Sequence, residues 1–236
     1  MDSREASLKD PKLLTAPAPF GFKTAWFTIR SEDSGAVAEA LEVKNPQSVN
    51  WEYGVWSGYS NDYRIFVSPP VRSWVLAMGL PILFEADDHA FERVVDLSKR
   101  FGEAQFFASM RVSSCYMWAC ASQGSLLRMF YEGDGQRRVL GEETATEREL
   151  GFKFFDPSSP ESQEPGYWER KDLTFPDEQS VLEVAAKWSI DPSKLDEMEL
   201  PPAYGLLGKP SASYPPKPEF LRPKRFRLIK RLLGLE

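Results

Sequence analysis

Three consecutive strand-like runs in the middle of the chain constrain its fold more than any other feature. Short turns that contain glycine follow the second run, at 123–124, and the third run, at 133–135. Short connections of this kind join antiparallel neighbours, whereas parallel strands need a long crossover. The pattern therefore predicts an antiparallel meander, which a short strand at 138–140 closes. The three runs are 104–110, 114–121 and 126–131.

Other segments add strands and helices to this meander. A run of β-branched and aromatic residues at 24–30 predicts a strand, and 63–67 with 74–78 predicts a hairpin with a proline-containing loop. Apolar residues at helical spacing, preceded by capping residues, predict four helices. Their expected starts are Asp33 or Ser34, Asp87 or Asp88, Thr144, and Pro176-Asp177.

The aromatic segment 49–59 does not follow either pattern clearly. Gly54 and Gly58 interrupt it, so we interpret it as an irregular strand or a loop that packs its tryptophans. The order of all elements includes few parallel crossovers. The sequence therefore predicts an α+β fold, a mainly antiparallel sheet with helices packed on one face.

Composition divides the chain into four parts. All seven tryptophans precede residue 200, which predicts a single α+β domain over 22–200 after an N-terminal extension, 1–21. Seven prolines fall within 201–223, and they predict a proline-rich linker that runs along the surface or free in solvent. The last part, 224–236, has the pattern of a short basic amphipathic helix.

Charge is distributed unevenly between these parts. Seven of the 29 basic residues but only two of the 35 acidic residues lie in 210–236, so this stretch carries +5. The first 209 positions hold the other 22 basic and 33 acidic residues, a net charge of −11. A body of this sign repels phosphate, so no nucleic-acid partner is expected.

The sequence also bears on the compartment. The charged start has no apolar stretch of signal-peptide length, and the chain has no run of about 18 apolar residues, so we expect a cytoplasmic protein. Cys115 and Cys120 lie five positions apart in one predicted strand, which points them to opposite faces. We therefore expect no disulfide between them and interpret both as buried, small apolar residues.

A search for catalytic motifs finds none that would define an enzyme. The serine-hydrolase elbow G-x-S-x-G and the phosphate-binding patterns G-x-x-x-x-G-K-[ST] and G-x-G-x-x-G are absent. The single histidine, His89, could join Asp87, Asp88 and Glu92 in a metal site, but acidic residues at a helix start are more simply caps. The sequence thus predicts a non-enzymatic protein with no catalytic residue, metal or cofactor.

Two groups of residues are candidates for contact with a protein partner. Core packing is the simpler interpretation of the aromatic group, and a solvated face is the simpler interpretation of the acidic pair. The aromatic group is Trp51, Tyr53, Trp56 and Tyr59, and the acidic pair is Glu142 and Glu143.

The C-terminal part could dock as a helix. Its apolar residues group on one helical face and its basic residues flank that face, a pattern that suits an anionic membrane surface, another protein or the acidic body of this chain. A helix of this length is marginal alone in water and orders only against a partner. The candidate docking residues are Arg225, Phe226, Ile229, Lys230 and Leu233.

Three stretches carry a resemblance to a known group of proteins. The stretches WFTIRSEDSGAVAEAL, FVSPPVRSWVL and KRFGEAQFFA resemble an uncharacterised group of soluble bacterial α+β proteins, associated with the immunity proteins that accompany secreted antibacterial toxins. The resemblance covers roughly residues 22–195 and implies a protein that neutralises a toxin by covering a basic active-site region. No functional residue is carried over, because these stretches resemble fold motifs.

We therefore expect an immunity-type inhibitor that binds a cognate bacterial toxin through an acidic surface. Two alternatives stay open. One is an enzyme or small-ligand binder that uses an aromatic-lined pocket. The other is an adaptor that docks through its basic C-terminal helix.

Overall fold

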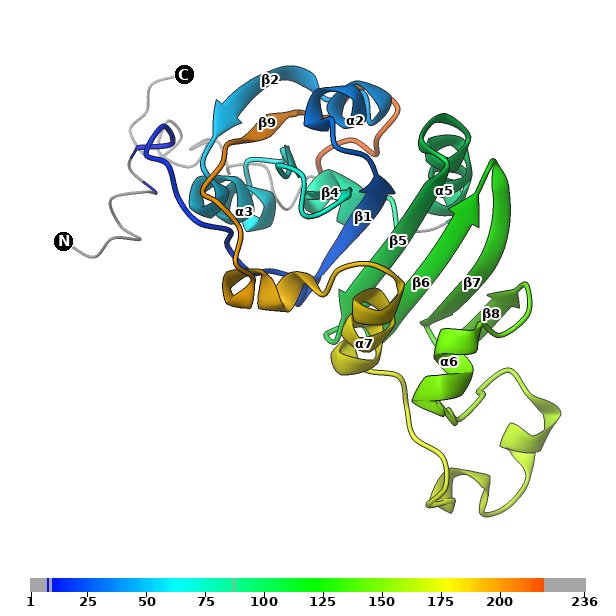
Figure 1. Ribbon diagram of the computed structural model, residues 1–236. Coiled ribbons are helices and arrows are strands. Elements are labelled where there is room, and N and C mark those ends of the chain that lie inside the picture. Colours follow the sequence, from blue (N-terminus) through cyan, green and yellow to red (C-terminus); the bar gives the residue numbers. More distant parts are fainter. Residues whose placement is uncertain (1–7, 9, 87, 219–236) are drawn as a thin grey trace, which may run out of the picture.

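The computed structural model describes residues 8, 10–86 and 88–218. Within this part of the chain, nine strands form one antiparallel sheet in the order β2-β9-β3-β4-β1-β5-β6-β7-β8 (Figure 1). The predicted α+β class with a mainly antiparallel sheet is therefore confirmed. The strands are β1 (Thr24–Arg30), β2 (Lys44–Val49), β3 (Ile65–Val67), β4 (Trp74–Met78), β5 (Glu103–Met110), β6 (Cys115–Ser122), β7 (Ser125–Gly133), β8 (Gln136–Leu140) and β9 (Gly205–Lys209).

Six α-helices and three short 3₁₀ helices complete the described elements. No helix in the described ranges has both the length and the apolar character needed to cross a membrane. The α-helices are α2 (Ser34–Ala40), α3 (Trp51–Tyr59), α4 (Leu80–Leu83), α5 (Asp88–Phe101), α6 (Ala145–Leu150) and α7 (Glu178–Trp188). The 3₁₀ helices are η1 (Pro160–Gln163), η2 (Tyr167–Glu169) and η3 (Pro192–Glu197).

The predicted meander is confirmed, because β5, β6, β7 and β8 are consecutive neighbours in the sheet. Phe107 lies opposite Trp118, and Trp118 lies opposite Phe130. Opposed residues point to the same face, so these rings form a cross-strand row. The rings of Trp118 and Phe130 stack with their centroids 4.0 Å apart. The predicted hairpin is present as well, with β3 paired to β4.

The local signals for helix starts are confirmed at α2, α6 and α7. The Asp33 carboxylate accepts hydrogen bonds from two backbone N–H groups at the start of α2. Thr144 and Glu147 form the expected capping box of α6, and Asp177 caps α7 with Ser180. The helix α5 begins at Asp88. The position before it, Asp87, lies outside the described residues, so the cap of this helix stays a prediction.

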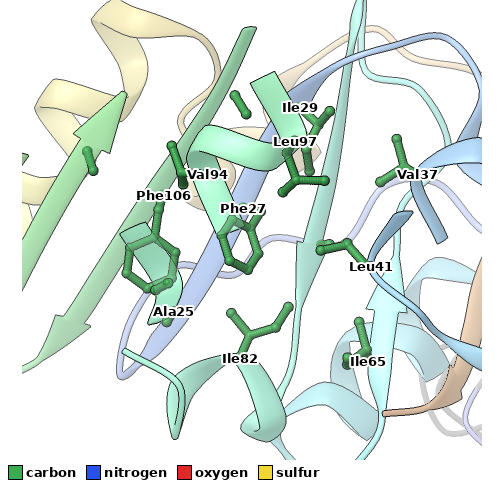
Figure 2. Packing of buried hydrophobic residues seen from close by; sticks show 14 of the residues in the cluster. Ala25, Phe27, Ile29, Val37, Leu41, Ile65, Ile82, Val94, Leu97 and Phe106 are labelled. Atoms are coloured by element: carbon green, nitrogen blue, oxygen red, sulfur yellow. The ribbon is translucent and has the colours of Figure 1, made fainter. Parts of the chain in front are cut away.

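The helices, expected on one face of the sheet, pack on both. The helices α2 and α5 cover one face, where Val37 and Val94 join Phe27 in one buried cluster (Figure 2). The helices α3 and α7 cover the other face, where their buried residues join Trp26 and Phe107 in a second cluster. The central strands explain the difference, because β1 is buried at its first six positions and β4 at all five. A strand buried on both faces needs a covering layer on each.

The interpretation of 49–59 as an irregular strand or loop is wrong, because most of this segment forms α3. Asn50 caps the helix by accepting a hydrogen bond from the N–H of Tyr53 at 2.7 Å. Gly54 and Gly58 are one turn apart and lie against the sheet. A Cβ atom at Gly54 would come within 2.2 Å of the Phe66 ring. The glycines therefore permit close packing of the helix on the sheet instead of interrupting it.

The predicted linker at 201–223 needs a correction too. Residues 205–209 form β9, which lies between β2 and β3 and pairs with both. Leu207 is 1% exposed, so this strand belongs to the core. Prolines flank the strand at both ends and leave its N–H groups intact. At the other end of the chain, Phe20 of the predicted extension is 3% exposed and packs in the same cluster as Trp26.

Candidate functional site

The aromatic residues predicted as a partner surface on 51–59 divide between the core and the surface. Trp51 is 1% exposed, and its ring packs against Phe66 with centroids 5.6 Å apart. Tyr53 is half-buried and contacts Trp56, which is 47% exposed. Trp51 is therefore a core residue, whereas Trp56 is available for contact with a partner.

Tyr59 has a structural role at the end of α3. Its hydroxyl accepts a hydrogen bond from the N–H of Gly21 at 3.2 Å and donates one to the carbonyl of Phe22 at 2.9 Å. Burial raises the pKa of the Tyr59 hydroxyl to about 12, so it stays protonated at neutral pH. This side chain joins the segment before β1 to α3.

The acidic candidates Glu142 and Glu143 lie far from α3. Both are exposed in the loop between β8 and α6, whereas α3 packs over β3 and β9. Strands β3 and β8 are six positions apart in the sheet. At about 4.8 Å per strand this is roughly 30 Å. The structure therefore does not bring the two predicted groups into one surface.

The C-terminal docking candidates Arg225, Phe226, Ile229, Lys230 and Leu233 lie outside the described residues. The predicted docking helix stays a prediction.

A pair of exposed aromatic rings lies on the segment between α6 and α7. Trp168 is 47% exposed and Phe175 is 59% exposed, and their rings are nearly parallel with centroids 6.1 Å apart. They lie over Phe155 and Tyr167, which are buried. We call these four residues the aromatic platform. In Figure 1 the segment that carries it extends beyond β8 and α6, away from the rest of the sheet.

Hydrogen bonds hold the aromatic platform in place. The indole N–H of Trp168 donates to the carbonyl of Ser162 at 3.0 Å. The N–H of Phe155 donates to the carbonyl of Thr174 at 2.8 Å, so the two ends of the segment are joined. The Trp168 ring and the backbone that carries Phe175 are therefore held before any partner binds, which reduces the ordering cost of binding.

The surroundings of the aromatic platform are acidic. Residues 155–175 contain five acidic and two basic residues, a net charge of −3. Four of the acidic residues are exposed, and one of these, Asp172, pairs with Arg170 at 2.6 Å. The exposed acidic residues are Glu161, Glu164, Glu169 and Asp172.

Two buried arginines hold the loops next to the aromatic platform. The first, Arg128 on β7, pairs with Glu147 of α6 at 2.8 Å, and both side chains are less than a tenth exposed. Arg128 also donates to the carbonyl of Gly141 at 2.8 Å, and the Trp118 indole N–H donates to Glu147 at 2.9 Å. Burial acts to raise the pKa of Glu147, but the hydrogen bonds from Arg128, Thr144 and Trp118 outweigh it and lower the pKa.

The second buried arginine is Arg137 on β8. Its guanidinium pairs with Glu132 and donates to the carbonyl of Phe155, while its backbone N–H donates to Ser158 at 2.9 Å. Burial raises the pKa of Glu132, and the pairing with Arg137 offsets only part of this effect. Arg137 thereby attaches residues 155–158, the first part of the segment between α6 and α7, to the edge of the sheet.

The two arginine networks border a cleft of about 250 Å³ between β6–β8 and α6, which we call the acidic cleft. Its lining includes four aromatic rings and three carboxylates. It is lined by Trp118, Arg128, Phe130, Arg137, Val139, Glu143, Glu147, Phe152, Phe154 and Asp156. One of the two predicted acidic residues, Glu143, therefore borders a cavity, whereas Glu142 does not line it.

The two cysteines and His89, which the sequence analysis also considered, do not form a reactive or metal-binding group in the described part of the chain. Both cysteines are free and half-buried, although we expected them to be buried. Burial raises the pKa of Cys115 to about 11 and that of Cys120 to about 12, so neither thiol ionises readily at neutral pH. His89 and Glu92 line a separate cavity of about 400 Å³. Within the described part of the chain, no group of three or more potential metal ligands is present.

Sequence analysis did not identify the aromatic platform, because the polar stretch 156–166, with its three prolines, separates the aromatic residues that form it. The signal was the aromatic residues at both ends of that stretch, Phe155 on one side and Trp168 and Phe175 on the other. Comparisons of the chain with protein-family models, curated proteins and solved structures found no match.

Proposed function

We propose that this protein is a non-enzymatic inhibitor that neutralises a bacterial toxin by direct contact, as an immunity protein does. The partner is a protein with a basic active-site region, and the contact surface is the aromatic platform with its acidic surroundings. The observation that carries the proposal is the exposed, parallel pair Trp168 and Phe175. Rigid aromatic side chains dominate the energy of many protein interfaces.

The net negative charge of this protein also supports a partner with a basic active-site region. The first 209 residues carry −11, and the segment 155–175 carries −3. A negative surface steers a positive partner during encounter and raises the association rate, an effect that salt reduces. Contact with an apolar spot inside a basic region would combine this steering with burial of the two rings.

The experiment measures binding to the secreted effector protein encoded beside this one, with both proteins purified. Wild type should form a complex, and the effector's activity should fall as the complex forms. Trp168→Ala should weaken binding by at least about thirtyfold, which corresponds to about 2 kcal/mol, the usual threshold of an interface hot spot.

Trp56→Ala is the matched control, because Trp56 is also 47% exposed but lies on α3 near the other end of the sheet. It should bind like wild type. Equal losses in both variants would remove the aromatic platform from the proposal. No complex between wild type and any secreted neighbour would contradict the proposed function itself.

A further inference from the structure

The acidic cleft has a size that suits one side chain. Its volume of about 250 Å³ lies below the roughly 300–1,000 Å³ of pockets that hold drug-sized ligands. It opens next to the segment that carries the aromatic platform, because Asp156 follows the platform residue Phe155 directly. The cleft and the aromatic platform therefore share one stretch of chain.

The charges that line the cleft are not balanced. Arg128 and Arg137 are each paired with a buried carboxylate, Glu147 and Glu132. This leaves two lining carboxylates, Glu143 and Asp156, and neither forms an ion pair with a residue in the described ranges. Asp156 accepts one hydrogen bond, from the N–H of Ser158 at 2.9 Å. The lining residues thus include three carboxylates and two guanidiniums, a net charge of −1, and Glu143 and Asp156 are the two carboxylates outside the ion pairs.

The two carboxylates stand on loops that are already fixed. The loop of Glu143 is held from both sides, because Arg128 binds the carbonyl of Gly141 and Glu147 accepts the N–H of Thr144 at 2.8 Å. The N–H of Asp156 donates to the Tyr167 hydroxyl at 2.7 Å. A cation that enters the cleft therefore meets both carboxylates with little further ordering of the chain.

The walls suit the stem of a long cationic side chain. Phe152 and Phe154 stack with centroids 4.9 Å apart and line the cleft with Val139, which is 44% exposed. Lysine and arginine bury their methylene stems along apolar surface while the charged head stays at a polar group. Aromatic faces attract the same cations.

We infer that the acidic cleft receives a lysine or arginine side chain of the partner, with Glu143 and Asp156 as its counter-charges. The inference rests on the proposed function and specifies the partner's chemistry. The Arg128 and Arg137 networks position the two carboxylates, and the aromatic platform supplies the apolar contact next to them.

The test is the double variant Glu143→Gln with Asp156→Asn, measured with the purified effector. The substitutions keep the shape of the side chains and remove both charges. Affinity should fall by at least about tenfold, and binding should depend less on salt, because a buried charge on the partner loses its counter-charges. The midpoint of urea unfolding should stay near that of wild type.

The control is Glu142→Gln, which removes the same charge from the same loop outside the cleft. It should retain wild-type affinity. If the double variant binds as tightly as wild type while Trp168→Ala does not, the cleft inference is overturned and the proposed function stands. If Glu142→Gln weakens binding as much as the double variant, general surface charge explains the effect and the cleft inference is again overturned.

A second arm identifies the inserted side chain. Each exposed lysine and arginine of the effector's active-site region is changed to methionine, and binding is measured against wild type and the double variant. One such change should weaken binding to wild type by about tenfold and leave binding to the double variant unaltered. Strictly additive losses at every position would contradict insertion of a cation.

Discussion

The helix α3 and the segment between α6 and α7 both expose a tryptophan to the same extent, but they are held by different forces. On α3, Trp56 is carried by a helix whose glycines pack tightly against Phe66 and Met78. On the segment between α6 and α7, Trp168 lies beside loops held by buried ion pairs. The comparison shows that apolar packing attaches α3 directly to the core of the protein. Buried ion pairs instead fix loops that carry charge to the surface.

The largest effect is expected from breaking one ion pair. Glu147→Ala leaves Arg128 buried without its counter-charge and should lower the free energy of unfolding by about 3–5 kcal/mol. Urea unfolding monitored by tryptophan fluorescence measures this loss. The control is Glu149→Ala on the same helix, where the pair with Lys187 is exposed and contributes about 0–1 kcal/mol. Equal losses in both variants would contradict a special role for the buried pair.

The corresponding change at α3 should have a smaller effect. Gly54→Ala places a methyl group about 2.2 Å from the buried Phe66 ring, and overpacking of this kind costs about 1–3 kcal/mol. The better helix propensity of alanine, about 1 kcal/mol, offsets part of it. Gly58→Ala should cost less, because the nearest atom belongs to the flexible thioether of Met78. A Gly54→Ala variant as stable as wild type would show that α3 is not held by close packing.

Acid should weaken the Arg128 network selectively. The pKa of Glu147 is lower in the folded protein than its ordinary value of 4.5. The unfolded chain therefore binds the proton more readily, and the stability from this carboxylate is lost as the pH falls below about 4.5. Glu132 has a raised pKa and acts in the opposite direction. The difference in unfolding free energy between wild type and Glu147→Gln isolates the Glu147 contribution, and it should shrink from pH 5 towards pH 3.

The smallest effects on stability are expected from the exposed tryptophans. Trp56→Ala and Trp168→Ala should each change the free energy of unfolding by about 1 kcal/mol or less, because half of each ring is in solvent. Thermal unfolding of both variants measures this. A loss of several kcal/mol in Trp168→Ala would show that the aromatic platform is a core element and not a binding surface.

Some of the residues in these two regions could be predicted from sequence. Trp56 and Glu143 were named as partner-binding candidates, and the capping box of Thr144 and Glu147 was found from its spacing. The pairing of Glu147 with Arg128 was not predicted, because the two residues are 19 positions apart in the chain. Arg137 and Asp156 were missed for the same reason. Both belong to polar segments that come together only when the sheet forms.

The sequence by itself determined the meander of β5–β8, the hairpin of β3 and β4, and the caps of α2, α6 and α7. These features depend on residues within one turn or one hairpin, where local hydrogen bonds and side-chain alternation decide the backbone. The tertiary structure alone decided that α3 is a helix, that β9 enters the sheet, and that helices cover both faces. Each depends on distant surfaces, such as the Phe66 ring at Gly54 or the paired edges of β2 and β3. Local sequence determines the meander, the hairpin and the caps, whereas the packing of the elements determines which charged and aromatic side chains remain at the surface.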